Sequence, residues 1–175
     1  MAQNTEKQFL DAYEKYADDI YRHCYFRVYN KQLAEDLTQE TFIKTWKYIT
    51  EGKEIQNIKS FLYRVAVNLI IDHSRKKKEL YLEDVASKES GESIRLSNIG
   101  EEQEIFNRFE SGKIVKLMEE LPDNQKQVMI MRYVDELLPA EIAEILGETA
   151  NAVSVRINQA TNKLRKILEE HGKLN

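Results

Sequence analysis

Apolar residues recur at steps of three and four along most of the chain, and this spacing limits the fold more than any other feature. In residues 5–28, for example, Phe9, Tyr13, Ile20 and Cys24 follow helical steps and would line one face of an α-helix. No segment shows the strict apolar and polar alternation of a strand. Only 6 glycines and 2 prolines interrupt the 175 residues. The sequence therefore predicts an all-α protein.

The first half of the chain contains two further predicted helices. Asn30 can cap the second, and either Asn57 or Ser60 can begin the third. A short polar loop around Gly52 separates them. The third helix is expected to end in a basic cluster at residues 75–78.

Residues 87–111 have a different character. They are polar, carry 3 basic against 6 acidic side chains, and show no sustained apolar period. Such a composition buries too little apolar surface to offset the entropy of ordering. We therefore expect two small helical domains, residues 1–86 and 112–175, joined by a flexible acidic linker, residues 87–111.

The last segment predicts a helix-turn-helix. A helix capped by Asp123 is followed by a short helix from Pro139 to Gly147, and a longer helix begins near Thr149. A short helix, a turn containing glycine and a longer helix form the arrangement that many DNA-binding proteins use.

The polar face of the final helix suits a DNA groove. Residues 149–168 contain four basic side chains and no acid. Arginine can read guanine, amides can read adenine, and phosphates repel carboxylates. A surface helix of an ordinary bundle explains the spacing almost equally well, and the absence of acids tips the interpretation modestly toward DNA.

The third predicted helix carries Arg64, Asn68 and Arg75 on one side, with aromatic residues nearby in sequence. A basic, aromatic face can bind single-stranded nucleic acid. Aromatics at helical spacing are more often core residues, however, and lysines at a helix end often only complement the helix dipole. Spacing alone therefore predicts that four aromatic residues belong to the core: Tyr13, Tyr16, Tyr21 and Trp46.

Composition and motifs argue against several classes of protein. The chain has no glycine-rich phosphate loop, and His23, His73 and His171 are scattered. We expect no enzyme, no metal, no cofactor and no small-molecule substrate. The N-terminus does not resemble a secretory signal, and no apolar run reaches the roughly 18 residues of a membrane span. A single cysteine, Cys24, fits a reducing compartment, so we expect a cytoplasmic protein without membrane insertion.

Three blocks, at residues 34–46, 60–78 and 121–168, together resemble the extracytoplasmic-function group of the sigma-70 family of RNA polymerase sigma factors. They read AEDLTQETFIKTW, SFLYRVAVNLIIDHSRKKK and LPDNQKQVMIMRYVDELLPAEIAEILGETANAVSVRINQATNKLRKIL. Their order is that of the family's polymerase-binding helix, minus-ten-reading helix and minus-thirty-five-reading domain. The resemblance implies a protein that binds core RNA polymerase, directs it to promoters and helps to melt the minus-ten element.

The resemblance also implies roles for individual residues. Core polymerase would be bound by Asp36, Gln39, Glu40 and Phe42. Minus-ten DNA would be bound by Arg64, Asn68, Arg75, Lys76, Lys77 and Lys78, with the loop at residues 50–58 capturing a flipped base. Minus-thirty-five DNA would be bound by Thr149, Ser154, Val155, Arg156, Asn158, Gln159 and Asn162.

Partners and alternatives follow from the same resemblance. The implied partners are core RNA polymerase, promoter DNA and an anti-sigma factor, and the linker would either enter the RNA-exit path or act as a plain tether. The family commonly has basic residues at three positions that here hold Ser154, Gln159 and Thr161. The affinity of this helix for the DNA backbone would therefore be weak. The competing hypotheses are a stand-alone helix-turn-helix regulator that binds duplex DNA as a dimer, and a helical adaptor that binds no DNA.

Overall fold

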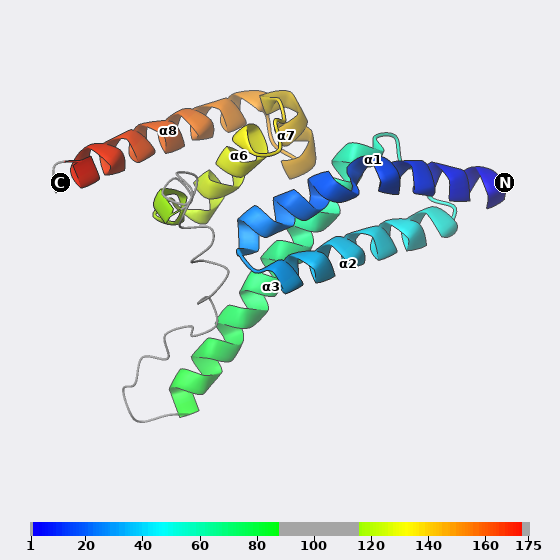
Figure 1. Ribbon diagram of the computed structural model, residues 1–175, viewed down its shortest axis with the longest axis horizontal. Helices are drawn as coiled ribbons and strands as arrows, with labels where there is room; N and C mark the ends of the chain where they lie inside the picture. Colours follow the sequence, from blue (N-terminus) through cyan, green and yellow to red (C-terminus); the bar gives the residue numbers. More distant parts are fainter. Residues whose placement is uncertain (1, 88–115, 173–175) are drawn as a thin grey trace. The chain divides into compact units, whose positions relative to one another are not determined.

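The computed structural model describes residues 2–87 and 116–172, and the side chains of residues 6–82 and 116–170. Every regular element in these ranges is a helix (Figure 1). The chain separates into two compact units, Met1–Glu101 and Glu102–Asn175. The all-α fold with two domains is therefore confirmed. The predicted linker lies outside the described residues except for Ser87, which is the last residue of a helix.

The first unit consists of α1 (Ala2–Val28), α2 (Lys31–Thr50) and α3 (Ile58–Ser87), which all pack against one another. Asn30 caps α2 as predicted, because its Oδ1 accepts a hydrogen bond of 2.8 Å from the Leu33 N–H. The centre of the unit is filled by side chains with at most 2% exposure: Ile20, His23, Cys24, Ala34, Thr41, Thr45, Leu62, Tyr63, Ala66 and Ile70.

Helix α3 begins at one of the two residues that the sequence offers and ends later than expected. Asn57 is the residue that caps it, since its Oδ1 accepts a hydrogen bond of 3.1 Å from the Ser60 N–H. The helix then continues through the basic cluster to Ser87. Lysine, glutamate and leucine, which dominate residues 76–82, are good helix formers, so the helix continues beyond its packed part.

The second unit consists of α6 (Asp123–Tyr133), α7 (Pro139–Leu146) and α8 (Ala150–Gly172), preceded by a helical turn at residues 116–119. The prediction that Asp123 caps α6 is wrong. Pro122 holds the cap position without a side-chain hydrogen bond, and Asp123 lies in the first turn, where its charge complements the helix dipole. Helices α6, α7 and α8 bury Val128, Ile130, Met131, Ile142, Val153 and Ala160 between them.

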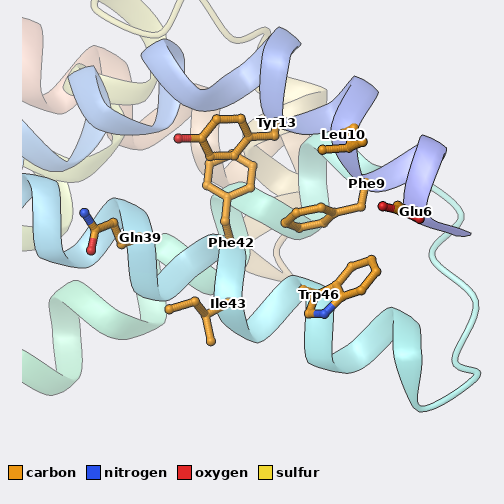
Figure 2. Close-up of a pocket in the computed structure, with 8 residues that line it drawn as sticks. All are labelled: Glu6, Phe9, Leu10, Tyr13, Gln39, Phe42, Ile43 and Trp46. Carbon is orange, nitrogen blue, oxygen red and sulfur yellow. The ribbon is translucent and has the colours of Figure 1, made fainter.

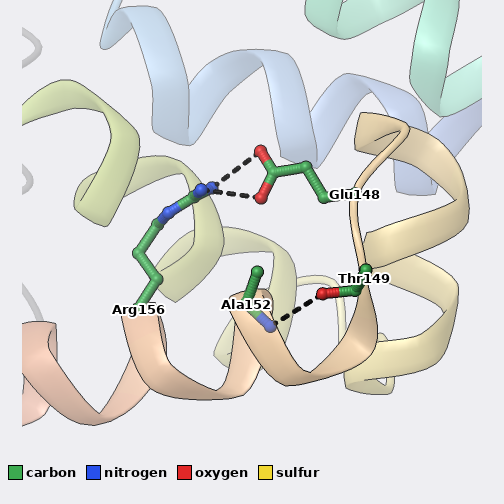
Figure 3. Close-up of polar contacts among 4 residues, drawn as sticks. All are labelled: Glu148, Thr149, Ala152 and Arg156. Atoms are coloured by element: carbon green, nitrogen blue, oxygen red, sulfur yellow. Dashed lines mark hydrogen bonds and ion pairs between the residues drawn. The ribbon is translucent and has the colours of Figure 1, made fainter.

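The turn between α7 and α8 depends on Gly147 and Thr149. Gly147 has a φ of 68°, in the left-handed region that glycine enters without steric cost. The Glu148 N–H then donates to the Ala143 carbonyl at 2.9 Å. Thr149 caps α8 through its Oγ1, which accepts from the Ala152 N–H at 3.1 Å (Figure 3). The predicted helix-turn-helix is thus present, with its turn at the predicted glycine.

Replacing Gly147 with alanine is expected to destabilise the second unit by about 1–2 kcal/mol, the cost of a left-handed backbone for a residue with a Cβ. No atom lies within 4 Å of the position that the Cβ would take, so the cost is backbone strain without a clash. Hydrogen exchange of the α7 and α8 amides measures the loss. Gly147→Asn should cost less, because asparagine tolerates this region better; equal protection in wild type and Gly147→Ala would contradict the prediction.

Candidate functional site

The outer face of α2 carries three exposed polar side chains in the positions expected from the sequence. Asp36, Gln39 and Glu40 are all exposed. Asp36 accepts a hydrogen bond of 3.2 Å from Gln32 Nε2, and Glu40 lies 3.5 Å from Lys44 Nζ. Both contacts are one turn along the same helix and leave the carboxylates facing solvent, where a partner can reach them.

Phe42, the fourth residue of this predicted set, lies elsewhere. It is only 3% exposed, and its ring centroid is 4.8 Å from that of Tyr13 and 6.2 Å from that of Phe9. Phe42 therefore joins α2 to α1 and supports the exposed face from beneath, instead of forming part of that face.

A groove of about 560 Å³ between α1 and α2 borders the polar face (Figure 2). Its lining residues are Glu6, Phe9, Leu10, Tyr13, Gln39, Phe42, Ile43 and Trp46. Several apolar side chains here face solvent, with Ile43 at 64% exposure, Leu10 at 51% and Trp46 at 37%. Gln39 belongs to both the groove and the polar face, so the two surfaces are continuous.

This groove corrects the prediction that Tyr13 and Trp46 are core residues. Tyr13 is 49% exposed, and Trp46 lies at the groove with its ring centroid 5.0 Å from that of Phe9. Tyr16 and Tyr21 are partly buried. Helical spacing identified the face that Trp46 shares with α1 but not the limited depth of that contact. Ile43, four residues after Gln39, was the available signal for an apolar patch beside the polar face.

The outer side of α3 carries the second predicted set of residues. Arg64, Asn68, Arg75 and all three lysines at 76–78 are exposed. Successive helical residues rotate by about 100°, so Arg64, Asn68, Arg75 and Lys78 fall along one stripe, with the exposed Ile71 between them. Lys76 and Lys77 point to other sides of the helix. Sequence reasoning did not single out Ile71.

The loop between α2 and α3 contains an exposed ion pair. Lys53 Nζ lies 2.7 Å from Glu51 Oε2 and 4.9 Å from the centroid of the Tyr48 ring. The hydrogen bond from Lys53 lowers the pKa of Glu51, and the same bond raises the pKa of Lys53. Both groups therefore remain charged at neutral pH, and their exposed ion pair joins the residues on the two sides of Gly52.

Helix α8 presents the third set. Val153 and Ala160 are fully buried and Ile157 is 9% exposed, as the predicted inward face requires. The opposite side of α8 and its N-terminal cap present Thr149, Val155, Asn158, Gln159 and Asn162 to solvent, with Ser154 and Arg156 partly buried. At about 100° per residue, Val155, Asn158, Gln159 and Asn162 share this side of the helix, and Arg156 lies at its edge, nearest to Gln159.

Arg156 has a partner that sequence reasoning missed. Its two terminal nitrogens contact the two carboxylate oxygens of Glu148, with Nη1–Oε1 at 3.1 Å and Nη2–Oε2 at 2.6 Å (Figure 3). The acid-free stretch begins at residue 149, one residue after Glu148. Because Glu148 lies in the turn before the helix, the pair does not follow helical spacing, and no local pattern predicts it.

Two further kinds of site are absent from the described part of the chain. Among those residues, no group of three or more histidine, cysteine, aspartate or glutamate side chains is placed to hold a metal ion. No helix within the described ranges is sufficiently long and apolar to span a bilayer.

Comparison with known proteins agrees with the two-unit architecture. Residues 12–79 match the family Sigma-70 region 2, and residues 111–164 match Sigma-70, region 4. The first match covers most of α1–α3 and the second contains α6, α7 and the first part of α8. A helical unit with an exposed polar face, followed by a helix-turn-helix unit, is therefore the pairing of regions 2 and 4 found in sigma-70 proteins.

Individual relatives narrow the class. The chain is 34% identical over 167 residues to the ECF RNA polymerase sigma factor SigW of Bacillus subtilis, with 93% of this chain and 89% of SigW covered. It is 32% identical over 149 residues to the ECF sigma factor SigM of the same organism, with 83% and 86% covered. The chain belongs to the extracytoplasmic-function sigma factors of the sigma-70 family. It directs RNA polymerase to promoters, and a stand-alone dimeric regulator is not favoured.

Solved structures show the same fold. The sigma factor RpoE of Bartonella quintana, in complex with the anti-sigma factor NepR, aligns with a TM-score of 0.71 at 19% identity, covering 93% of this chain and 98% of RpoE. CnrH, in complex with the cytosolic domain of CnrY, aligns with a TM-score of 0.70 at 17% identity, covering 97% and 94%.

Proposed function

We propose that the exposed face of α2 is the surface by which this sigma factor binds core RNA polymerase. Asp36, Gln39 and Glu40 supply the polar contacts, and Phe42 holds the face in place by packing on α1. The observation that supports this assignment is the continuity of these polar residues with the exposed apolar groove. Apolar anchors bordered by polar groups are the usual composition of a binding hot spot.

The stripe on α3 is proposed to contact the minus-ten element. Arg64, Arg75 and Lys78 would neutralise phosphates along the helix, and Asn68 would pair with a base edge. The exposed Ile71 adds an apolar surface against which an unstacked base can lie. Lys76 and Lys77 would attract the DNA backbone from either side. Together with the loop at residues 50–58, this face would capture a flipped base and so help to melt the duplex.

Helix α8 is proposed to enter the major groove at the minus-thirty-five element. Its exposed amides at Asn158, Gln159 and Asn162 can recognise adenine, and Val155 can contact a thymine methyl group. Thr149 and Ser154 lie in the first turns, the part of a recognition helix that reaches base edges. Arg156 would contribute a guanidinium at the edge of this face, and the exposed Arg165 lies one turn beyond Asn162.

Three further proposals follow from membership of the family. The chain acts by binding its partners. It performs no catalysis and uses no cofactor or small-molecule substrate of its own. It works in the cytoplasm, where polymerase and chromosome are found. An anti-sigma factor regulates it. The structurally similar RpoE is bound by the anti-sigma factor NepR, and the structurally similar CnrH is bound by CnrY.

Run-off transcription tests the proposed function. Adding the protein to core RNA polymerase on a library of upstream regions, including that of its own gene, is expected to produce discrete promoter-specific transcripts. Core enzyme alone provides the control. Absence of any new transcript, together with failure to co-purify with core enzyme, would overturn the proposal.

A further inference from the structure

Glu148 occupies an unusual place for an acid, at the edge of the proposed DNA-binding surface. It lies in the turn directly before Thr149, the residue that caps α8. Its carboxylate reaches two turns along the helix to Arg156 and holds both terminal nitrogens of the guanidinium (Figure 3). The side chains of Arg156 and Glu148 are 21% and 31% exposed, so the pair is accessible but sheltered.

We propose that Glu148 is an internal competitor for DNA, which engages Arg156 and thereby restrains the binding of α8 to DNA of arbitrary sequence. The proposal rests on the assignment of α8 to the minus-thirty-five element. It makes Glu148 a specificity-determining residue, although its charge is the wrong one for contact with DNA.

The geometry of the pair explains the competition. A guanidinium binds a carboxylate, a phosphate or the O6 and N7 atoms of guanine by presenting two parallel N–H groups. In Arg156 the two terminal nitrogens already meet Glu148 in this manner. DNA can bind these two nitrogens only by displacing the carboxylate of Glu148. The displaced carboxylate would then lie unpaired beside the phosphates.

The energetic consequence differs between the two kinds of DNA. An isolated phosphate offers Arg156 little more than the carboxylate does, so on generic duplex the pair remains closed and one cationic contact is missing. A promoter that offers a correctly placed guanine, together with the amide contacts of α8, can open it. The low basic content of this helix, with four cationic side chains in residues 149–168, makes the loss of one contact significant.

A role in folding alone predicts the opposite effect. An acid near a helix N-terminus stabilises the helix, so if Glu148 served only to stabilise α8, its neutralisation would weaken the unit and lower DNA binding. The competitor role predicts that neutralisation raises it. The sign of the change in affinity therefore separates the two.

The test compares the full chain with its Glu148→Gln variant on a fluorescent duplex that contains no promoter, over a range of salt concentrations. Glu148→Gln is expected to bind about threefold more tightly, and the slope of log affinity against log salt should steepen by about one phosphate contact. Glu169→Gln is the matched control. It makes the same charge change, on α8 but about 20 Å along the axis from Arg156, beyond the Debye length at physiological salt.

Arg156→Ala completes a double-mutant cycle with Glu148→Gln. The competitor role predicts that Arg156→Ala has little effect on generic binding in the wild-type chain and abolishes the gain in the Glu148→Gln chain. Equal binding of Glu148→Gln and Glu169→Gln, or weaker binding of Glu148→Gln, would overturn the proposal. Retention of the gain without Arg156 would also overturn it.

The cycle also separates this proposal from the assignment of α8. One outcome is that Arg156→Ala weakens promoter binding of the holoenzyme by the same factor in the wild-type chain and in the Glu148→Gln chain. In that case α8 contacts DNA but Glu148 does not compete. If Arg156→Ala changes neither promoter nor generic binding in either background, the assignment of Arg156 to DNA is itself wrong, and the competitor role fails with it.

Discussion

The double substitution Asp36→Lys, Glu40→Lys is expected to weaken binding to core RNA polymerase by about 30-fold or more, the equivalent of roughly 2 kcal/mol for loss of a hot spot. Both carboxylates face solvent on α2 and bond only to neighbours on the same helix. Their replacement removes no packing contact and changes the charge of the surface by four units. Binding to labelled core enzyme, measured by titration, gives the result directly.

A matched double substitution controls for this change in charge. Glu14 and Asp18 are exposed, four residues apart on α1, so Glu14→Lys, Asp18→Lys alters net charge by the same amount. It should leave polymerase affinity within a fewfold of wild type. If both double variants lose affinity equally, long-range electrostatics and not the α2 face determines binding, and the docking assignment is contradicted.

Ile142→Ala is expected to remove about 2–5 kcal/mol from the stability of the second unit, the usual cost of truncating a buried isoleucine. Ile142 is 0% exposed in α7, which packs against both α6 and α8. A small domain has a total stability of only about 5 kcal/mol. We therefore expect the helix-turn-helix to be largely unfolded at 37 °C, and promoter recognition by α8 to be lost with it.

The sole tryptophan of the chain makes this prediction specific. Trp46 lies in the first unit, so its fluorescence should report an unchanged unfolding transition, while circular dichroism shows early loss of helix. Leu168→Ala, a truncation at a 54% exposed position of α8, should alter stability by less than about 0.5 kcal/mol. A shift in the Trp46 transition of Ile142→Ala would show that the two units do not unfold separately.

Much of the fold was predictable because its determinants are local. The spacing of Val153, Ile157 and Ala160 identified the buried side of α8, and Asn30 and Gly147 marked the ends of helices through side-chain and backbone chemistry within a few residues. Such signals depend only on neighbours in sequence, so no knowledge of the tertiary structure was needed to interpret them.

The features that sequence reasoning missed depend on tertiary packing or on the shape of a turn. Trp46 has the spacing of a core residue, yet the depth of its burial is set by how closely α1 approaches α2, which no local pattern encodes. The pairing of Glu148 with Arg156 joins the turn before α8 to a residue about two turns along it, which no local pattern encodes. The length of α3 was underestimated because a basic run was interpreted as a helix end, although its residues favour helix.

The length of α3 also divides that helix into two parts with different resistance to local opening. As far as Ile70 its apolar residues are buried or half-buried, whereas residues 74–82 are all exposed, including Leu80, Tyr81 and Leu82. Opening the first part disrupts the core, but opening the second breaks backbone hydrogen bonds and the exposed ion pair of Arg75 with Asp72, and can occur by fraying. The basic residues 75–78 therefore stand on a stretch that would be able to bend along a distorted nucleic acid. Asn68, about two turns before Arg75, is held rigidly by the packed half of the same helix.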